Sequence, residues 1–256
     1  MDLGLQGAVV LVTGGVRGVG LGITRAFRSA GATVITCARR EPDSGQDATF
    51  LHCDVRDAGQ VATLVTTIVE RFGRLDVVVN NAGGAPHADS ATASPRFHSG
   101  VVGLNLLAPL LVSQRANVVM QAQDGGGSIV MVSSVSGSRP SPGTAAYGAA
   151  KAGLNNLTAS LAIEWAPKVR VNSLGVGMVR TELVELHYGD EEGVRAVGAT
   201  VPLGRMAEPD EIGACAVFLA SPLASYVSGA SLLVHGGGEV PAFLTASTAS
   251  HNQEKS

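Results

Sequence analysis

Short runs of apolar, mostly β-branched residues alternate along the chain with longer segments that have the spacing of helices. Apolar runs this short are typical of the buried strands of a parallel sheet. The strands predicted in this way are Val9–Val12, Thr33–Thr36, Phe50–Cys53, Val77–Val79, Ile129–Val132, Val169–Val171 and Leu232–Val234. The segments long enough to be crossover helices are Gly20–Ala30, Ala58–Phe72, Val101–Ala122, Ala145–Trp165 and Glu208–Leu219.

This alternation predicts an α/β fold, a doubly wound sheet of seven parallel strands with helices on both faces. The chain has 256 residues, of which 45% are hydrophobic, so it can bury one large core. We expect a single domain over residues 1–244. Residues 245–256 have little apolar surface to bury, so we expect a flexible tail unless they cross to a neighbouring subunit. In such sheets, ligands bind at the carboxyl ends of the strands.

Charged residues make up only 15% of the chain, well below the roughly 25% usual for soluble domains. This deficit indicates that other subunits cover part of the surface, and we expect an oligomer. The formal net charge is −3 and the basic residues are scattered, which argues against nucleic-acid and membrane partners. Cys37, Cys53 and Cys215 have no paired spacing, so we interpret them as core residues in a reducing compartment, with no metal site.

The N-terminal segment lacks the positive region and the small-residue cleavage site of a signal peptide, and it leads straight into a glycine turn. The longest uncharged stretch, Ile212–Val234, contains Pro222 and Gly229, which fit a buried helix, a turn and a strand better than a membrane span. We therefore expect a cytoplasmic protein.

A glycine-rich turn joins the first predicted strand to the first predicted helix. Its sequence is Thr13-Gly14-Gly15-Val16-Arg17-Gly18-Val19-Gly20. Such a turn places backbone N–H groups and a helix N-terminus where a pyrophosphate can bind, and a Cβ would block that approach. A tight connection from strand to helix needs glycine as well, so the loop alone does not decide between a cofactor site and a turn.

The chain resembles the short-chain dehydrogenase/reductase family, first in the T-G-x3-G-x-G pattern of this loop and then in further motifs, in order, across almost the whole chain. The resemblance implies a single-domain Rossmann fold and an NAD(P)-dependent oxidoreductase. The cofactor contacts that it implies are Gly14, Gly18, Val19 and Gly20 in the loop, Asp54 and Val55 at the adenine, Asn81, Ala82 and Gly83 near the adenosine, and Gly177, Val179 and Thr181 at the nicotinamide. For Asp54, a turn or a helix cap is the alternative.

The choice between NAD and NADP depends on the residues that end the second predicted strand. An acid there would hydrogen-bond the ribose hydroxyls of NAD and repel a 2′-phosphate. The strand ends instead in Cys37-Ala38-Arg39-Arg40, and Arg17 lies in the glycine loop, so two guanidinium groups can converge on a 2′-phosphate. The sequence thus favours NADP. The alternative is that the arginines are solvated surface charges and that Glu41 contacts the ribose.

Tyr147 and Lys151 lie four residues apart on a predicted helix, on one face and one turn from each other. A tyrosine is a poor acid/base at neutral pH, but an adjacent cation favours the phenolate, so we expect Lys151 to lower the pKa of Tyr147. The family resemblance implies that this pair is catalytic and that both residues also contact the cofactor, with Lys151 holding the ribose. It also implies that Ser134, 13 residues before the tyrosine, hydrogen-bonds the substrate oxygen, with Ser133 and Ser136 as weaker candidates.

The family resemblance further implies that Asn105 holds a water against the catalytic lysine; the alternative is an amide that satisfies core hydrogen bonds. Two departures from the family pattern stand out: Val176 where proline is usual, and His235 where an acid is usual. Without the fixed φ of proline, the loop at Val176 can be more mobile.

Residues 181–204 are expected to form a variable lid, with Leu183, His187 and Tyr188 as candidate substrate contacts beside Leu186. Their mostly apolar character favours a hydrophobic ketone or secondary alcohol as substrate. A steroid, a 3-oxoacyl thioester and a simple aromatic ketone all fit this description. Surface positions for His187 and Tyr188 are the alternative.

Family members that reduce double bonds generally space the Tyr and Lys further apart, so the resemblance favours ketone/alcohol chemistry over enoyl reduction. A protein that senses or binds the dinucleotide without turnover is the alternative function, although all four catalytic positions are present. The segments Phe97–Gln114 and Ser228–Gly238 resemble the subunit contacts of the family, which implies a homotetramer.

Overall fold

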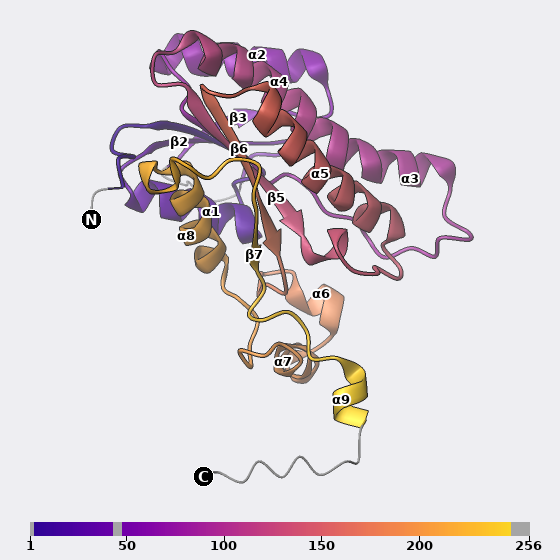
Figure 1. Cartoon of the computed structure of the whole chain (residues 1–256). Coiled ribbons are helices and arrows are strands. Elements are labelled where there is room, and N and C mark those ends of the chain that lie inside the picture. Colours follow the sequence, from indigo (N-terminus) through magenta and orange to yellow (C-terminus); the bar gives the residue numbers. More distant parts are fainter. Residues whose placement is uncertain (1–2, 43–47, 247–256) are drawn as a thin grey trace, which may run out of the picture.

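A computed structural model describes residues 3–42 and 48–246. Its seven strands form one parallel sheet in the order β3-β2-β1-β4-β5-β6-β7 (Figure 1), which confirms the predicted doubly wound fold. The strands are β1 Val9–Thr13, β2 Thr33–Ala38, β3 Thr49–His52, β4 Val77–Asn80, β5 Gly127–Ser134, β6 Val169–Val176 and β7 Ser231–Val234. The order reverses between β1 and β4, which is where such sheets bind ligands.

Helices cover both faces of the sheet. They are α1 Gly18–Ser29, α2 Ala58–Phe72, α3 Pro95–Val102, α4 Ala108–Ala122, α5 Ala145–Glu164, α6 Val184–Tyr188, α7 Glu191–Ala199, α8 Pro209–Ala220 and α9 Ala242–Ala246. The apolar side chains of α2, α4 and α5 pack on one face of the sheet, and those of α1 and α8 pack on the other. Cys37 and Cys53 are buried thiols in the first of these cores. Of the predicted tail, residues 247–256 lie outside the described residues.

One long helical run replaces the predicted helix Val101–Ala122. It begins at Pro95 because the Ser94 hydroxyl accepts a hydrogen bond from the N–H of Phe97, and it passes through a π-helical turn, Gly103–Leu107, between α3 and α4. Within the described part of the chain, this 28-residue run is the one helix that is long and apolar enough to cross a membrane, by length and composition alone. Because α4 packs against the sheet through its buried side chains, this is weak evidence for a membrane span.

The segment after β6 includes residues 181–204, the predicted lid. Helices α6 and α7 lie together with α9 beyond one end of the sheet (Figure 1). They have a small apolar cluster of their own, in which Val184, Val194 and Met206 are buried against Met178 and Tyr188. The segment after β6 therefore packs separately from the two main cores.

Candidate active site

The glycine loop and the segment after β4 form one hydrogen-bonded unit. The Asn81 side chain donates to the carbonyls of Thr13 and Gly14 at 3.0 and 3.1 Å, and the Thr13 hydroxyl accepts the N–H groups of Asn81 and Ala82 at 3.0 Å. A Cβ on Gly20 would lie 2.2 Å from the Gly14 carbonyl oxygen, so the loop cannot take a side chain there. The resulting cradle ends at the N-terminus of α1, where backbone N–H groups suit a pyrophosphate.

The residues predicted at the adenosine lie on loops that follow β1, β2 and β3. Arg17 and Arg39 are exposed, and Arg39 is near enough to Asp54 to help lower the pKa of that carboxyl. The main partner of Asp54 was missed by the sequence analysis: Arg56 donates to its carboxylate at 2.9 and 2.6 Å and is the largest cause of a pKa of about 2. The spacing of two residues between Asp54 and Arg56 was a usable signal for this pair.

The other predicted cofactor residues near this region differ in exposure. Val55 is buried in the core, whereas Val19 and Gly83 are on or near the surface of the site and Glu41 is exposed.

Ser134, Tyr147 and Lys151 come together at the carboxyl end of β5. Ser134 is the last residue of that strand, and a hydrogen bond joins its side chain to that of Tyr147. The Lys151 Nζ lies 5.6 Å from the centroid of the Tyr147 ring and donates to the Val132 carbonyl at 2.7 Å. By contrast, Ser133 is buried and its hydroxyl points to the Lys151 carbonyl at 3.4 Å, while the N–H of Ser136 donates to the Ser134 hydroxyl. Of the three serines, Ser134 is the one bonded to the phenol.

Burial controls the titration of the Tyr147 and Lys151 pair. Burial raises the pKa of Tyr147, and the hydrogen bond from Ser134 opposes this rise without reversing it. Burial lowers the pKa of Lys151 from 10.5 to about 8. The expectation that Lys151 lowers the pKa of Tyr147 is therefore wrong for this arrangement, because the ammonium is turned to the Val132 carbonyl and desolvation of the phenol dominates. Tyr147 is a neutral phenol with a proton to give.

Asn105 lies in the π-helical turn and is fully buried. Its amide donates to the carbonyls of Gly84 and Val101 at 2.9 Å and accepts the N–H of Gly84 at 2.8 Å. The side chain thus satisfies core hydrogen bonds, as the alternative interpretation had it. It is nevertheless close to the lysine, since a Cβ on Gly83 would lie 2.8 Å from the Asn105 Oδ1 and 3.5 Å from the Lys151 Nζ. A π-helical turn is common at functional sites.

The segment after β6 crosses to the glycine loop. Val179 forms a bridge with Ala207, and the Thr181 methyl lies 3.4 Å from the place of a Cβ on Gly18. The neighbouring Glu182 carboxylate accepts the N–H of Gly18 at 3.1 Å, so a side-chain anion lies at the N-terminus of α1. Sequence reasoning missed this contact, which joins residues 164 positions apart.

The three predicted substrate residues lie on the lid, but only one is turned inward. Leu183 and His187 are exposed, whereas Tyr188 is half-buried and its hydroxyl donates to the Met178 sulfur at 3.0 Å.

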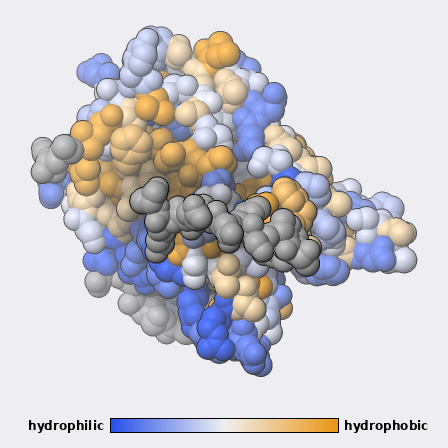
Figure 2. Space-filling view, turned by 60° about the horizontal axis from the view of Figure 1, so that its bottom comes forward, coloured by the Kyte–Doolittle hydropathy of each residue, from blue (hydrophilic) through white to orange (hydrophobic). Residues whose placement is uncertain are grey.

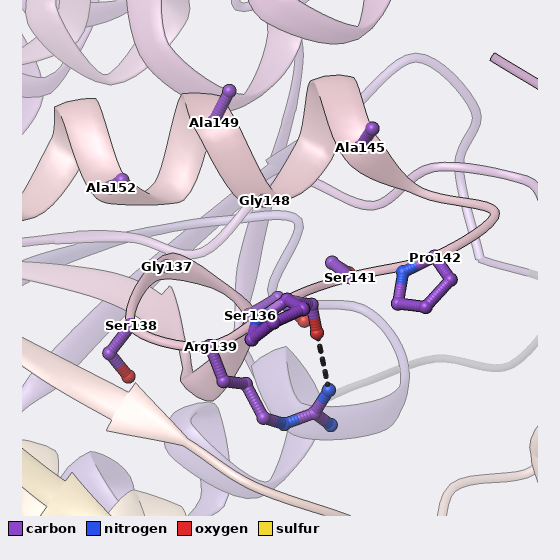
Figure 3. Close-up of a pocket in the computed structure, with 11 residues that line it drawn as sticks. Ser136, Gly137, Ser138, Arg139, Ser141, Pro142, Ala145, Gly148, Ala149 and Ala152 are labelled. Atoms are coloured by element: carbon purple, nitrogen blue, oxygen red, sulfur yellow. Dashed lines mark hydrogen bonds between the residues drawn. The ribbon is translucent and has the colours of Figure 1, made fainter.

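A cavity of about 270 Å³ opens beside Met178, and sequence reasoning did not identify most of its walls. Its lining residues are Val135, Ser138, Arg139, Gly177, Met178, Leu233, His235, Gly238 and Glu239. A second and more open hollow of about 570 Å³ lies between the loop Ser136–Pro142 and α5, and Arg139 is one of its lining residues (Figure 3). His235, a departure from the family pattern, lines the cavity beside Met178. It packs closely on Gly177, since a Cβ placed on Gly177 would lie 2.7 Å from the His235 Cβ.

Comparisons with known proteins support a catalytic interpretation of this geometry. A family model described as enoyl-(acyl carrier protein) reductase matches residues 14–239. A tropinone reductase homologue of Arabidopsis thaliana is 36% identical over 251 residues, with 93% of each chain covered. A 3alpha-hydroxysteroid dehydrogenase of Mediterraneibacter gnavus is 34% identical, with 92% of this chain and 98% of that protein covered.

Solved structures agree with these sequence relatives. The ligand-free aldohexose dehydrogenase of Thermoplasma acidophilum superposes with a TM-score of 0.87 at 30% identity, covering 93% of this chain and 96% of that one. A putative short-chain alcohol dehydrogenase of Sinorhizobium meliloti gives a TM-score of 0.86 at 33% identity, covering 94% and 100%.

Proposed function

Because this chain belongs to the short-chain dehydrogenase/reductase family and is an NAD(P)-dependent oxidoreductase that acts on CH–OH groups, we propose that it interconverts a hydrophobic ketone and its secondary alcohol with NADP(H). The observation that carries this proposal is the contact between Ser134 and Tyr147 one helical turn from the buried Lys151. A site with these groups can polarise a carbonyl and supply its proton.

The proposed chemistry assigns one role to each side chain. The Ser134 hydroxyl orients the substrate oxygen, and in the reducing direction Tyr147 gives its phenolic proton to that oxygen as the carbon receives a hydride. When bound, the nicotinamide cofactor supplies the hydride. Lys151, whose Nζ lies 5.6 Å from the centroid of the phenol ring, would hold the ribose of the cofactor. Asn105 would position Lys151, since both side chains lie close to Gly83.

A dinucleotide fits the residues of the glycine loop. The cradle at Gly20 admits no side chain, and the loop leads into the N-terminus of α1. Gly14, Gly18, Val19, Asn81 and Ala82 would line the pyrophosphate and adenosine end, with Asp54 and Val55 at the adenine. Gly177, Val179 and Thr181 would hold the nicotinamide end.

The preference for NADP rests on Arg17 and Arg39. Both are exposed and follow β1 and β2, which are paired so that Thr13 lies opposite Cys37. Their guanidinium groups can therefore approach one phosphate at the ribose, where each would add a charge-assisted hydrogen bond.

The spacing of Tyr147 and Lys151 supports ketone chemistry. The names of the relatives also support it, since they include tropinone reductase homologues and a hydroxysteroid dehydrogenase. The matching family model, by contrast, is described as an enoyl reductase. Tyr188, with Leu183 and His187 at the rim, would face the substrate from the lid.

We also propose a cytoplasmic homotetramer. Figure 2 shows a broad apolar area on the face of the molecule that it views. Large apolar side chains are exposed on two separate sets of elements, Leu107, Val118 and Ile163 along the α4 and α5 region and Phe218, Leu223, Tyr226 and Leu233 along the α8 and β7 region. Exposed apolar area of this kind on two surfaces suits two subunit contacts.

The proposed function is tested by following the oxidation of NADPH and NADH with a panel of ketones. We expect turnover with NADPH and a hydrophobic ketone. Tyr147→Phe keeps the ring but removes the proton donor, so kcat should fall by roughly a hundredfold or more while NADPH binding, followed by fluorescence, is retained. Binding of NADPH without consumption of any ketone would favour a dinucleotide sensor instead.

A further inference from the structure

The cavity beside Met178 is lined by a cation with an unused donor. Arg139 follows Ser134 by five residues. Its Nη2 donates to the Glu239 carboxylate at 2.6 Å and its Nη1 to the Pro140 carbonyl at 3.1 Å, the bond drawn as a dashed line in Figure 3. Its Nε is buried and has no acceptor among the described residues. A buried N–H without a partner is costly, so this position favours the arrival of a further acceptor.

The walls of the cavity lie at the carboxyl ends of the strands, the edge of the sheet that also carries Ser134. They come from the segments that follow three neighbouring strands: Val135 after β5, Gly177 and Met178 after β6, and His235 after β7. Val135 directly follows Ser134, and Met178 lies in the segment proposed to hold the nicotinamide end of the cofactor. A substrate whose carbonyl lies at Ser134 and whose body passes Val135 and Met178 would meet the guanidinium.

Glu239 is the one carboxylate lining this cavity in the described ranges 3–42 and 48–246. Its pairing with Arg139 is a single contact rather than the two-pronged geometry that a guanidinium and a carboxylate can reach, and the two side chains are 37% and 36% exposed. Exposed ion pairs contribute little to stability, so another carboxylate can replace Glu239 at small cost. The lid is within reach of the pair, since Arg139 and Glu239 both act on the pKa of Tyr188, in opposite directions.

We propose that the substrate is an oxo acid, or the corresponding hydroxy acid, whose carboxylate binds Arg139 in place of Glu239. Arg139 is then a specificity-determining residue that contacts the substrate, and Glu239 is a competitor for the same guanidinium. The inference rests on the proposed function and narrows its substrate to a ketone with an apolar body and one carboxylate at a distance from the carbonyl.

The test compares levulinate and its longer methyl-keto acid homologues with their methyl esters, using NADPH and the full-length protein. The readout is the ratio of kcat/KM for each acid to that for its ester. The unmodified protein should prefer at least one acid. Arg139→Gln should lower that ratio by about ten- to a hundredfold, the loss expected for one charge-assisted hydrogen bond. Glu239→Gln should raise it, because the competing carboxylate is gone.

Arg25→Gln is the matched control, since Arg25 makes an exposed ion pair with Asp210 away from the cavity, and it should leave the ratio unchanged.

A fall in the ratio for both Arg139→Gln and Glu239→Gln would overturn the proposal, because it would mean that the pair only anchors the segment after β7. Equal use of acids and esters by the unmodified protein would overturn it as well, with the oxidoreductase function intact. Should Arg139→Gln fail to fold, the direction of the Glu239→Gln change decides the matter. Failure of every ketone would instead refute the proposed function, and this inference with it.

Discussion

The burial of Lys151 allows a quantitative prediction, because keeping its ammonium charged inside the protein lowers the free energy of unfolding. The side chain is 3% exposed and its pKa falls from 10.5 to about 8. At pH 7 this difference corresponds to a cost of about 3 kcal/mol for keeping the ammonium charged inside the protein. The neutral amine can still donate to the Val132 carbonyl above pH 8, a bond that contributes roughly 0.5–1.5 kcal/mol. Lys151→Met removes the charge and this bond, since methionine fills a similar volume without charge or donor.

The sign follows from the two pKa values. The folded state releases its proton at a lower pH than the unfolded state, so between pH 8 and 10.5 the unfolded chain binds more protons and the unmodified protein gains stability as the pH rises. The charge penalty should shrink from about 3 kcal/mol at pH 7 to about 1 kcal/mol at pH 10. Lys151→Met should therefore be more stable than the unmodified protein at pH 7, and it should lose about 2 kcal/mol of that advantage by pH 10.

The assay is urea unfolding at several pH values and one protein concentration, followed by the fluorescence of Trp165, the single tryptophan. Lys168→Met is the matched control, because Lys168 also donates to backbone carbonyls, those of Gln121 and Gln123, but is exposed. The stability difference between Lys151→Met and the unmodified protein should vary with pH more than that of this control. If it did not, the reasoning that a charged lysine is buried in the fold would be refuted.

Three further predictions concern the cofactor and the assembly. Arg39→Asp should change the ratio of the kcat/KM values for NADPH and NADH by about tenfold or more in favour of NADH, because a carboxylate repels the 2′-phosphate. An unchanged ratio would mean that Arg39 is a solvated surface charge without a role in cofactor choice. Glu182→Gln should bind NADPH more tightly, roughly two- to tenfold, since the carboxylate on the Gly18 N–H competes with the pyrophosphate; weaker binding in a fluorescence titration would contradict this. Light scattering at micromolar concentration should give the mass of a tetramer, and a monomer would leave the exposed Ile163 and Tyr226 without a subunit contact.

The sequence predicted the centre of every strand but not where the strands and helices begin and end. Apolar runs located every strand, yet Ile129–Val132 is only the centre of β5, which extends over Gly127–Ser134 because its polar ends pair with β6 from Val169 to Val176. Backbone pairing does not require apolar side chains, so periodicity underestimates such strands. The start of α3 carried a usable signal, Ser94 before Pro95, since serine caps helices and proline suits their first position.

In the candidate site, local sequence determines which residues lie together on one helix, but it does not determine the direction of their side chains or their contacts with distant segments. The spacing of Tyr147 and Lys151 on one helix places them together in any structure that keeps the helix. The direction of the lysine toward the Val132 carbonyl depends on how α5 packs against β5, which spacing cannot reveal, and this is why the expected effect of Lys151 on the pKa of Tyr147 was wrong. The pair Arg139 and Glu239 spans 100 positions and leaves no local signature.

The order of the strands explains how reaction and specificity can be separated in this protein. The proposed proton donor and its lysine lie on α5, a helix packed into the core, whereas the cavity is built by the segments that leave β5, β6 and β7. Because these strands are neighbours, the three segments must meet, but side chains such as Arg139 and His235 are free to differ without disturbing the sheet. Loss of the Tyr147 hydroxyl should therefore abolish turnover of acids and esters alike, while loss of the Arg139 charge should change only which of them is preferred. A variant at Arg139 that removed both activities equally would mean that cavity and reaction centre are one unit.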